Sequence, residues 1–252
     1  MKFLTYDEVD PDAVYRLMST SFGWGGVTAS AVQRERREDP RCFEGFAFYA
    51  VENGKPVAQV IPFRMRVRLA TGIETIGAIA GVCSHPAKWG QGYARRTMER
   101  AHEWFREEGL RIAALTTSRN IRGFGLYRKM GYTELGPFFR AYRTLPRKRL
   151  RPKGIRLRKA RRGDLPLIVR LFGASTRGLL GWTVRSVEEF RASLTWNSRS
   201  IHRYRIVLRG GMPVAYFRTL ASNDVLFDEL VAPRGEDFRA TLELLEAESR
   251  SR

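Results

Sequence analysis

The sequence is poor in the residues that build metal sites and disulfide frameworks. Its 252 residues include two cysteines, Cys42 and Cys83, and three histidines. The cysteines form no Cys-x-x-Cys pair, and the sequence has no cysteine–histidine cluster. Neither a structural zinc site nor a disulfide scaffold is therefore predicted, and we expect no bound metal.

Long apolar segments are also missing. No apolar run approaches the roughly 20 residues that a membrane-spanning helix needs. The N-terminal segment Met-Lys-Phe-Leu-Thr-Tyr-Asp-Glu-Val-Asp becomes acidic too early for a signal peptide. These absences favour a cytoplasmic protein without a membrane partner.

Acidic residues are scarce relative to basic ones. Asp and Glu number 26, against 45 Lys and Arg, and the formal net charge is +19. Residues 151–252 contain 20 basic and 11 acidic residues, a net of +9, so the excess is spread along the chain. Such a surface favours anionic partners, such as nucleic acid or a phosphorylated cofactor. An arginine-rich composition without a functional role explains the charge equally well.

The pattern of apolar residues predicts a mixed α/β domain in the first half of the chain. Residues 45–52 and 56–69 are rich in β-branched and aromatic residues and flank Asn-Gly-Lys, which is a hairpin signal. Residues 73–86 are typical of a buried strand, and residues 92–108 of an amphipathic helix. The other predicted elements are helices at 10–22, 28–39 and 122–130 and strands at 110–117 and 132–145. This order predicts one central sheet flanked by helices.

A basic segment separates this domain from a second one. Residues 143–162 contain 11 basic residues, two prolines and no acid. The second half then opens with an alternating strand and a helix for which Asp164 is the predicted N-cap. It also repeats the hairpin of the first half, because Gly-Lys-Pro-Val-Ala at 54–58 returns as Gly-Met-Pro-Val-Ala at 211–215. We predict a tandem duplication, with a first domain at 1–145, a linker at 146–155, and an incomplete second copy at 156–252.

Residues 85–96, His-Pro-Ala-Lys-Trp-Gly-Gln-Gly-Tyr-Ala-Arg-Arg, place glycines and cations between a predicted strand and a predicted helix. The first turn of a helix has unpaired N–H groups and a partial positive charge. Glycine lets a bulky anion approach that backbone closely. The segment is therefore a candidate cradle for a diphosphate, although it is neither a dinucleotide-binding nor a Walker motif.

Two separated motifs resemble the GNAT superfamily, the Gcn5-related N-acetyltransferases. Residues 89–94, Trp-Gly-Gln-Gly-Tyr-Ala, are similar to the family's Arg/Gln-x-x-Gly-x-Gly/Ala motif, with Trp89 departing at the Arg/Gln position. The family's downstream pattern is met by Asn120, Leu126, Tyr127, Gly131 and Tyr132. The resemblance covers residues 1–145 and implies a GNAT fold of the α/β (α+β) class with a mixed, mostly antiparallel sheet. A second, incomplete GNAT-like unit would follow.

This resemblance implies an acetyl-CoA-dependent N-acetyltransferase. An acetyl group would move to a primary amine by direct attack in a ternary complex, with Tyr127 as the general acid. The implied cofactor contacts are Val82, Cys83, Ser84, Lys88, Trp89, Gly90, Gln91, Gly92, Tyr93, Ala94, Arg95 and Asn120. The acceptor, a small-molecule amine or a protein amino group, would lie near Phe22 and Trp24.

The tandem arrangement resembles that of enhanced-intracellular-survival-type acetyltransferases without their third domain. In those proteins only the first unit has a working cofactor loop. The corresponding segment of the second half is Pro-Arg-Gly-Glu-Asp-Phe, in which two acids follow one glycine. Because the acids would repel an anion, no second acetyl-CoA site is expected.

Alternatives stay open for several of these features. His85 and Cys83 also suit structural roles, at a strand end and in the core. The basic residues 143–162, and residues 202–211 with Tyr204 among arginines, suit a nucleic-acid-binding or interaction protein with a vestigial or sensory acetyl-CoA site. The incomplete second copy would leave an open sheet edge, which allows a homo-oligomer.

Overall fold

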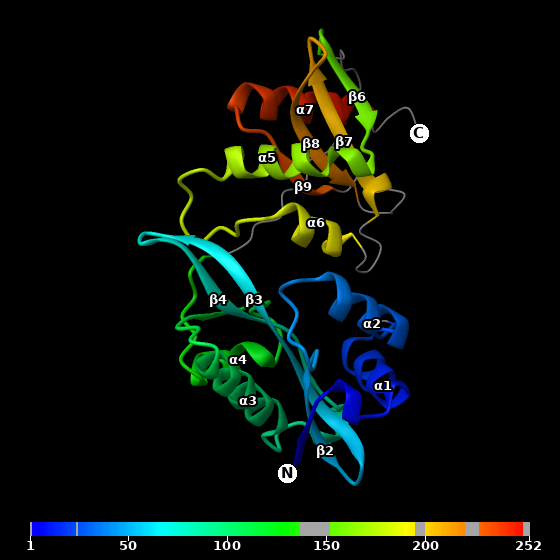
Figure 1. Ribbon diagram of the computed structural model, residues 1–252, viewed down its shortest axis with the longest axis vertical. Coiled ribbons are helices and arrows are strands. Elements are labelled where there is room, and N and C mark those ends of the chain that lie inside the picture. The colour runs from blue at the N-terminus through cyan, green and yellow to red at the C-terminus, as the bar shows by residue number, and fades with distance from the viewer. Residues whose placement is uncertain (1, 24, 137–151, 195–199, 220–226, 249–252) are drawn as a thin grey trace. The chain divides into compact units, whose positions relative to one another are not determined.

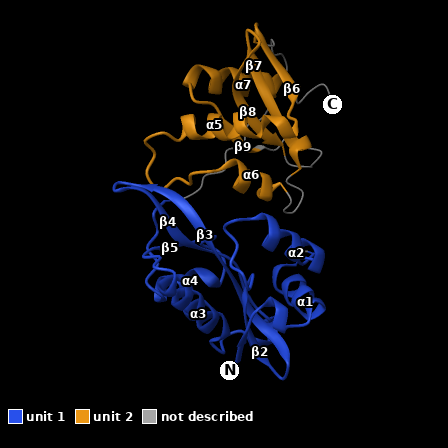
Figure 2. Ribbon diagram, viewed as in Figure 1, with its two compact units in different colours: residues 1–137 blue, residues 138–252 orange. Residues whose placement is uncertain are grey.

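The chain divides into two compact units, residues 1–137 and 138–252 (Figure 2). The computed structural model describes residues 2–23, 25–136, 152–194, 200–219 and 227–248. Each unit has its own sheet with helices on both faces (Figure 1). The predicted linker at 146–155 lies largely outside the described residues.

The first unit has a five-stranded sheet in the order β1-β2-β3-β4-β5. Its strands are β1 (Lys2–Leu4), β2 (Phe48–Glu52), β3 (Lys55–Leu69), β4 (Gly72–Ser84) and β5 (Ala113–Ala114). Only the β4–β5 pair is parallel. The predicted hairpin between β2 and β3 is confirmed, with φ of 50° at Asn53 and 73° at Gly54, the positive values of a tight two-residue turn.

Four α-helices cover this sheet, two on each face (Figure 1). They are α1 (Pro11–Phe22), α2 (Ala29–Glu38), α3 (Tyr93–Glu107) and α4 (Gly123–Lys129). The side chains of Asp10 and Thr28 cap α1 and α2. The buried face of α3 includes Met98, Trp104 and Phe105, which pack with α4 and the sheet in one core cluster.

A β-bulge interrupts the long pairing between β3 and β4. Ile61 pairs with Ala80 and Gln59 with Cys83, so Val60 lies opposite two residues of β4. One of the two is Gly81, whose φ of +57° belongs to the left-handed region, and a Cβ there would lie 2.7 Å from Ile61 Cδ1. The Gln59 side chain donates a hydrogen bond to the Gly81 carbonyl at 3.0 Å. Only glycine therefore suits this position.

Two predicted strands differ from the structure. The strand predicted at 110–117 is limited to Ala113–Ala114, which pair with Gly77 and Ala78 of β4. This pairing ends just before the bulge at Gly81, where the extra residue bends β4. Of the strand predicted at 132–145, residues 132–136 are not in a strand, and residues 137–145 lie outside the described part.

The second unit has a four-stranded antiparallel sheet in the order β6-β7-β8-β9. Its strands are β6 (Ile155–Lys159), β7 (Tyr204–Arg209), β8 (Met212–Thr219) and β9 (Phe227–Val231), and its helices are α5 (Leu165–Ser175), α6 (Val187–Ser193) and α7 (Gly235–Glu248). Helices α5 and α6 pack against one face of this sheet, where Ile206 and Tyr216 lie. The other face packs against Leu245 of α7.

The repeated Pro-Val-Ala segment takes the same irregular pairing in both units. In the first unit Val51 pairs with Pro56 and Ala50 with Ala58, so Val57 is the extra residue. In the second unit Leu208 pairs with Pro213 and Val207 with Ala215, so Val214 is the extra residue. The shared bulge adds a structural likeness to the sequence repeat.

Asp164 stands at the N-cap position of α5, as predicted, but its side chain does not cap that helix. Its carboxylate accepts hydrogen bonds from the Arg158 guanidinium at 2.7 Å and from the Arg161 amide at 2.8 Å. The carboxylate is therefore engaged by β6 and by the 3₁₀ turn that precedes α5.

Two carboxyl groups are buried together at the end of α2. Glu35 is 7% exposed and Asp39 is 6% exposed. Burial, followed by the hydrogen bond to Asp39, raises the pKa of Glu35 to about 9. Burial also opposes ionisation of Asp39, but the hydrogen bonds and charge of Arg41 outweigh it and lower the pKa of that carboxyl. At neutral pH, Glu35 is therefore protonated and Asp39 is ionised.

The stabilisation that results from replacing Glu35 with Gln should be larger at pH 8 than at pH 5 by more than about 1 kcal/mol. The wild-type carboxyl ionises above its ordinary value of 4.5 in the unfolded chain but only near 9 in the folded chain. Wild-type stability therefore falls as the pH rises between these values, whereas Gln mimics the protonated acid at every pH. Urea unfolding at both pH values measures the difference.

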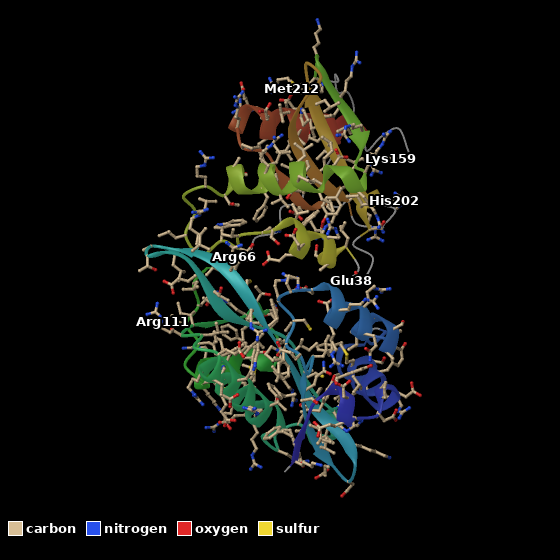
Figure 3. All side chains as sticks on the ribbon, viewed as in Figure 1. Glu38, Arg66, Arg111, Lys159, His202 and Met212 are labelled. Carbon is tan, nitrogen blue, oxygen red and sulfur yellow. The ribbon has the colours of Figure 1, made fainter. Side chains whose placement is uncertain are left out.

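Glu38→Gln is the matched control, since Glu38 is exposed on the same helix (Figure 3). It should not change how stability depends on pH. An effect of Glu35→Gln that is equal at pH 5 and pH 8 would contradict a protonated Glu35 in the native state.

Candidate active site

The last residues of β4 lead directly into the glycine-rich loop. After Ser84 the chain makes a single 3₁₀ turn, Pro86–Lys88, and α3 begins at Tyr93. The His85 side chain accepts a hydrogen bond from the Ala87 amide at 3.2 Å, so it caps this turn. His85 thus has a structural contact, which was the alternative to a role in catalysis.

The loop adopts a backbone conformation that favours glycine at two positions. Gly90 has a φ of +79° and Gly92 of +82°, and a Cβ on either would meet no atom within 4 Å. Gly92 is the N-cap of α3 and offers no side chain to its first turn. The first-turn amides, from Tyr93 to Arg95, therefore receive no capping hydrogen bond from the N-cap residue. A diphosphate fits this arrangement of amides and helix dipole.

Glu52, at the end of β2, ties the two ends of this loop together. Its carboxylate forms a salt bridge with the Lys88 ammonium and accepts a hydrogen bond from the Tyr93 hydroxyl at 2.7 Å. The Lys88 hydrogen bond, followed by that of Tyr93, lowers the pKa of Glu52. The Glu52 carboxylate thus offsets the positive charge of Lys88 in the protein without ligand.

Trp89 connects the loop to the end of β4. Its indole N–H donates a hydrogen bond to the Ser84 carbonyl at 3.0 Å. The same carbonyl accepts a hydrogen bond from the Ser21 hydroxyl of α1 at 3.3 Å. The guanidinium carbon of Arg122 lies 4.7 Å from the centre of the Trp89 ring. The residue that departs from the family motif therefore links the loop both to the end of β4 and to the start of α4.

The end of β4 has one edge without a strand in the described part of the chain. β5 pairs only with Gly77 and Ala78, so the predicted contact residues Val82 to Ser84 lie beyond that pairing. Burial, as the main cause, raises the pKa of Cys83 to about 12. A protonated, buried thiol is a poor nucleophile, which agrees with the core role considered above.

Tyr127 is placed in the same core cluster as Val82. It is 8% exposed, and burial, followed by the influence of Cys83, raises its pKa. Its ring meets that of Tyr132 edge-on, with centroids 6.1 Å apart, and the Tyr132 hydroxyl lies 2.7 Å from His102 Nε2. A hydroxyl that stays protonated at neutral pH can donate a proton.

The other predicted site residues make local contacts or lie apart. The Gln91 side chain donates to the Ala87 carbonyl at 3.4 Å, and Arg95 pairs with Glu99 at 2.8 Å. Ala94 accepts from the Thr97 hydroxyl within the first turn of α3. Asn120 lies in the turn before α4 and is exposed. Phe22 ends α1, next to Ser21, whereas Trp24 lies outside the described residues.

Sequence reasoning missed Glu52, Ser21 and Arg122. None of the three belongs to a motif that marks a ligand site, and each reaches the loop or the end of β4 only through the tertiary structure. Glu52 is the last residue of β2, next to the predicted hairpin turn. Its position gave no sign of a contact 41 residues further along the chain.

A profile of the acetyltransferase (GNAT) domain matches residues 3–135, which is just over half of the 252 residues. The chain belongs to the GNAT acetyltransferase family. This result confirms the family resemblance of the two motifs. No curated protein matches the sequence significantly.

Solved structures of GNAT proteins match almost the entire chain. A GCN5-related N-acetyltransferase from Kribbella flavida is 18% identical with a TM-score of 0.65, covering 97% of this chain and 62% of its own. A probable N-acyltransferase from Enterococcus faecalis V583, titled a conserved protein of unknown function, is 16% identical with a TM-score of 0.71, covering 99% and 62%. A GCN5-related N-acetyltransferase from Anabaena variabilis ATCC 29413 is 14% identical with a TM-score of 0.71, covering 100% and 63%.

At such low identity these matches establish the fold alone. They confirm the predicted fold class, a mixed sheet flanked by helices with a second sheet following. This chain spans about three fifths of the length of each match. Within the described ranges no group of three or more His, Cys, Asp or Glu residues could hold a metal ion. No helix there is long and apolar enough to cross a membrane.

Replacing Glu52 with Ala should loosen the loop of this GNAT domain. Both flanks, at Lys88 and Tyr93, lose their shared partner, so local opening becomes more frequent. Hydrogen–deuterium exchange of a peptide covering residues 88–95 should become roughly three-fold faster or more. Glu99→Ala is the matched control, because it removes one surface pair of α3 and leaves both flanks in place. Equal exchange in the two variants would contradict this role of Glu52.

Proposed function

We propose that the first unit is an acetyl-CoA-dependent N-acetyltransferase that acetylates a primary amine in a ternary complex. One observation carries this proposal. The uncapped first-turn amides of α3 closely follow a strand end that has one edge without a neighbouring strand in the described part of the chain. A diphosphate on the amides would place an extended, amide-containing arm along that edge.

Different groups of the site bind the cofactor and stabilise the charge that develops during acyl transfer. The amides of Gly90 and of the first turn of α3 bind the diphosphate, and the backbone of Val82 to Ser84 hydrogen-bonds the pantetheine arm. When bound, acetyl-CoA supplies an activated acetyl thioester. A backbone N–H at the end of β4 stabilises the negative charge that develops on the thioester oxygen.

Proton transfers complete the reaction. The neutral amine forms the new C–N bond as the C–S bond breaks, and the leaving thiolate takes a proton from the Tyr127 hydroxyl. The nitrogen loses its own proton to water, and the Tyr127 phenolate takes a proton back from water, so that no net proton is gained or lost. Phe22, at the end of α1, lies beside Ser21, which contacts the end of β4. We place the acceptor amine, from a small molecule or a protein, on this side of the strand.

One residue that motivated the nucleic-acid alternative is buried in the core of the second unit. Tyr204 is 1% exposed and packs against Phe190 and Tyr216, so its ring cannot stack on a base. Arg209, on the same strand as Tyr204, and Arg218, on β8, each form a salt bridge with an aspartate. In the first unit Arg66 lies on β3, and Arg111, between α3 and β5, pairs with Glu74 of β4 (Figure 3).

Gly92→Glu should abolish acetyl-CoA binding measured by titration calorimetry. The new carboxylate would lie at the amides that receive the diphosphate, and it would repel that anion. Gly109→Glu is the matched control, because Gly109 follows the other end of α3 with a φ of +70° and equally open surroundings. It introduces the same backbone strain and charge, and it should bind acetyl-CoA normally. Equal loss in both variants would indicate misfolding instead of a lost cradle.

Tyr127→Phe should lower kcat by about 100-fold or more while leaving the affinity for acetyl-CoA nearly unchanged. The substitution removes the proton donor and keeps the ring in the core cluster. Steady-state kinetics with an amine acceptor and detection of free CoA measure the effect. Tyr132→Phe is the control, since it removes a hydroxyl from the same aromatic group. A similar fall in kcat for both variants would argue that only packing is affected.

A further inference from the structure

The cations around the cofactor loop differ in whether a carboxylate already neutralises them. Lys88 pairs with Glu52, and Arg95 pairs with Glu99. At the first motif position, where the family pattern has Arg or Gln, this chain has the uncharged Trp89. The motif therefore offers no cation at its first position, and these two neighbouring cations already have partners.

Arg122 brings a cation to this place from another part of the chain. It immediately precedes α4, and its guanidinium lies over the Trp89 ring at 4.7 Å. Arg122 is exposed, and no carboxylate in the described part of the chain pairs with it. Stacking positions a guanidinium while its N–H donors stay free at the edge. Those donors suit a phosphate, which a guanidinium binds with two parallel hydrogen bonds.

The Trp89 side chain is itself held by a hydrogen bond, so its ring can fix the position of the Arg122 guanidinium. Its indole N–H is bonded to the Ser84 carbonyl at 3.0 Å, and two residues further on Gln91 bonds to the Ala87 carbonyl. The ring thus has a defined position between the end of β4 and Arg122. The contact joins the loop to α4 without involving Lys88 or Arg95.

We propose that Arg122, positioned by Trp89, binds a phosphate group of the nucleotide part of acetyl-CoA and replaces the cation that the loop motif lacks. This inference rests on the proposed function. It adds to the backbone cradle a cofactor-binding residue from outside the loop, and it makes Trp89 a positioning residue.

Titration calorimetry with acetyl-CoA at low and high NaCl concentration tests the proposal. Arg122→Met keeps an unbranched side chain that still covers the Trp89 ring but removes the charge. Its Kd should rise about ten-fold or more at low salt, with a weaker dependence on salt than in the wild type. Arg128→Met is the matched control, because Arg128 is an exposed arginine of α4; its Kd should stay within about two-fold of the wild type.

A second variant tests the replacement directly. In the Arg122→Met background, Trp89→Arg places a cation at the family's own position and should restore most of the lost affinity. Dephospho-CoA, which lacks the 3′-phosphate, distinguishes the two sources of phosphate. If Arg122→Met still weakens its binding, the contact is to the diphosphate; if the effect disappears, the contact is to the 3′-phosphate.

The outcomes separate this inference from the proposed function. Absence of acetyl-CoA binding by the wild type would overturn the proposed function, and this inference with it. Wild-type binding with an unchanged Kd in Arg122→Met would overturn only the inference. So would a raised Kd with the salt dependence of the wild type, because that result indicates a structural defect without loss of an ionic contact. Failure of Trp89→Arg to restore binding would overturn the replacement of the motif cation.

Discussion

At Gly81 the backbone of β4 turns into the left-handed region, and this bend shapes the end of β4 that borders the candidate site. The strand carries one more residue there than β3 opposite Val60, and β5 stops pairing three residues earlier. Beyond the bulge, the last residues of β4 have one edge without a strand among the described residues and lead into the loop and the first turn of α3. The φ of +57° at position 81 is one that side chains rarely adopt, and a Cβ there would also press against the end of the Ile61 side chain, so the bend favours glycine.

The protein has many basic side chains, but two of those next to the candidate site form salt bridges with carboxylates. The formal net charge of +19 suggests a uniformly cationic surface, yet Lys88 and Arg95 each have a carboxylate partner. Such pairs near the surface contribute little stability, and their effect here is to define geometry. Glu52 joins the two flanks of the loop, whereas Arg96 and Arg122 are exposed near the loop and pair with no carboxylate among the described residues.

The two units share a hairpin but differ in the first turn of the helix that follows the hairpin's next strand, which is α3 after β4 and α7 after β9. Both contain the Pro-Val-Ala bulge, at Val57 and Val214. In the first unit Gly92 leaves the amides of α3 uncapped. In the second, α7 has Glu236 and Asp237 in its first turn, and Asp237 is buried beside Arg209 at 2.8 Å. A carboxylate at the first turn satisfies a helix dipole internally, so the first turn of α7 is less suited to an anion than that of α3.

Much of the fold and the outline of the site could be predicted from the sequence, because those features depend on residues that are close in the chain. Segments rich in β-branched and aromatic residues and the Asn53-Gly54 turn specified the hairpin, and the periodic face of α3 specified that helix. Gly90 and Gly92 marked the cradle by residue type and spacing. The short β5, the bonding of Asp164 and the contacts of Glu52 and Arg122 could not be predicted in this way. Each depends on strand register or on contacts between residues that are far apart in the sequence. Local sequence does not determine which of those residues will be in contact in the folded chain.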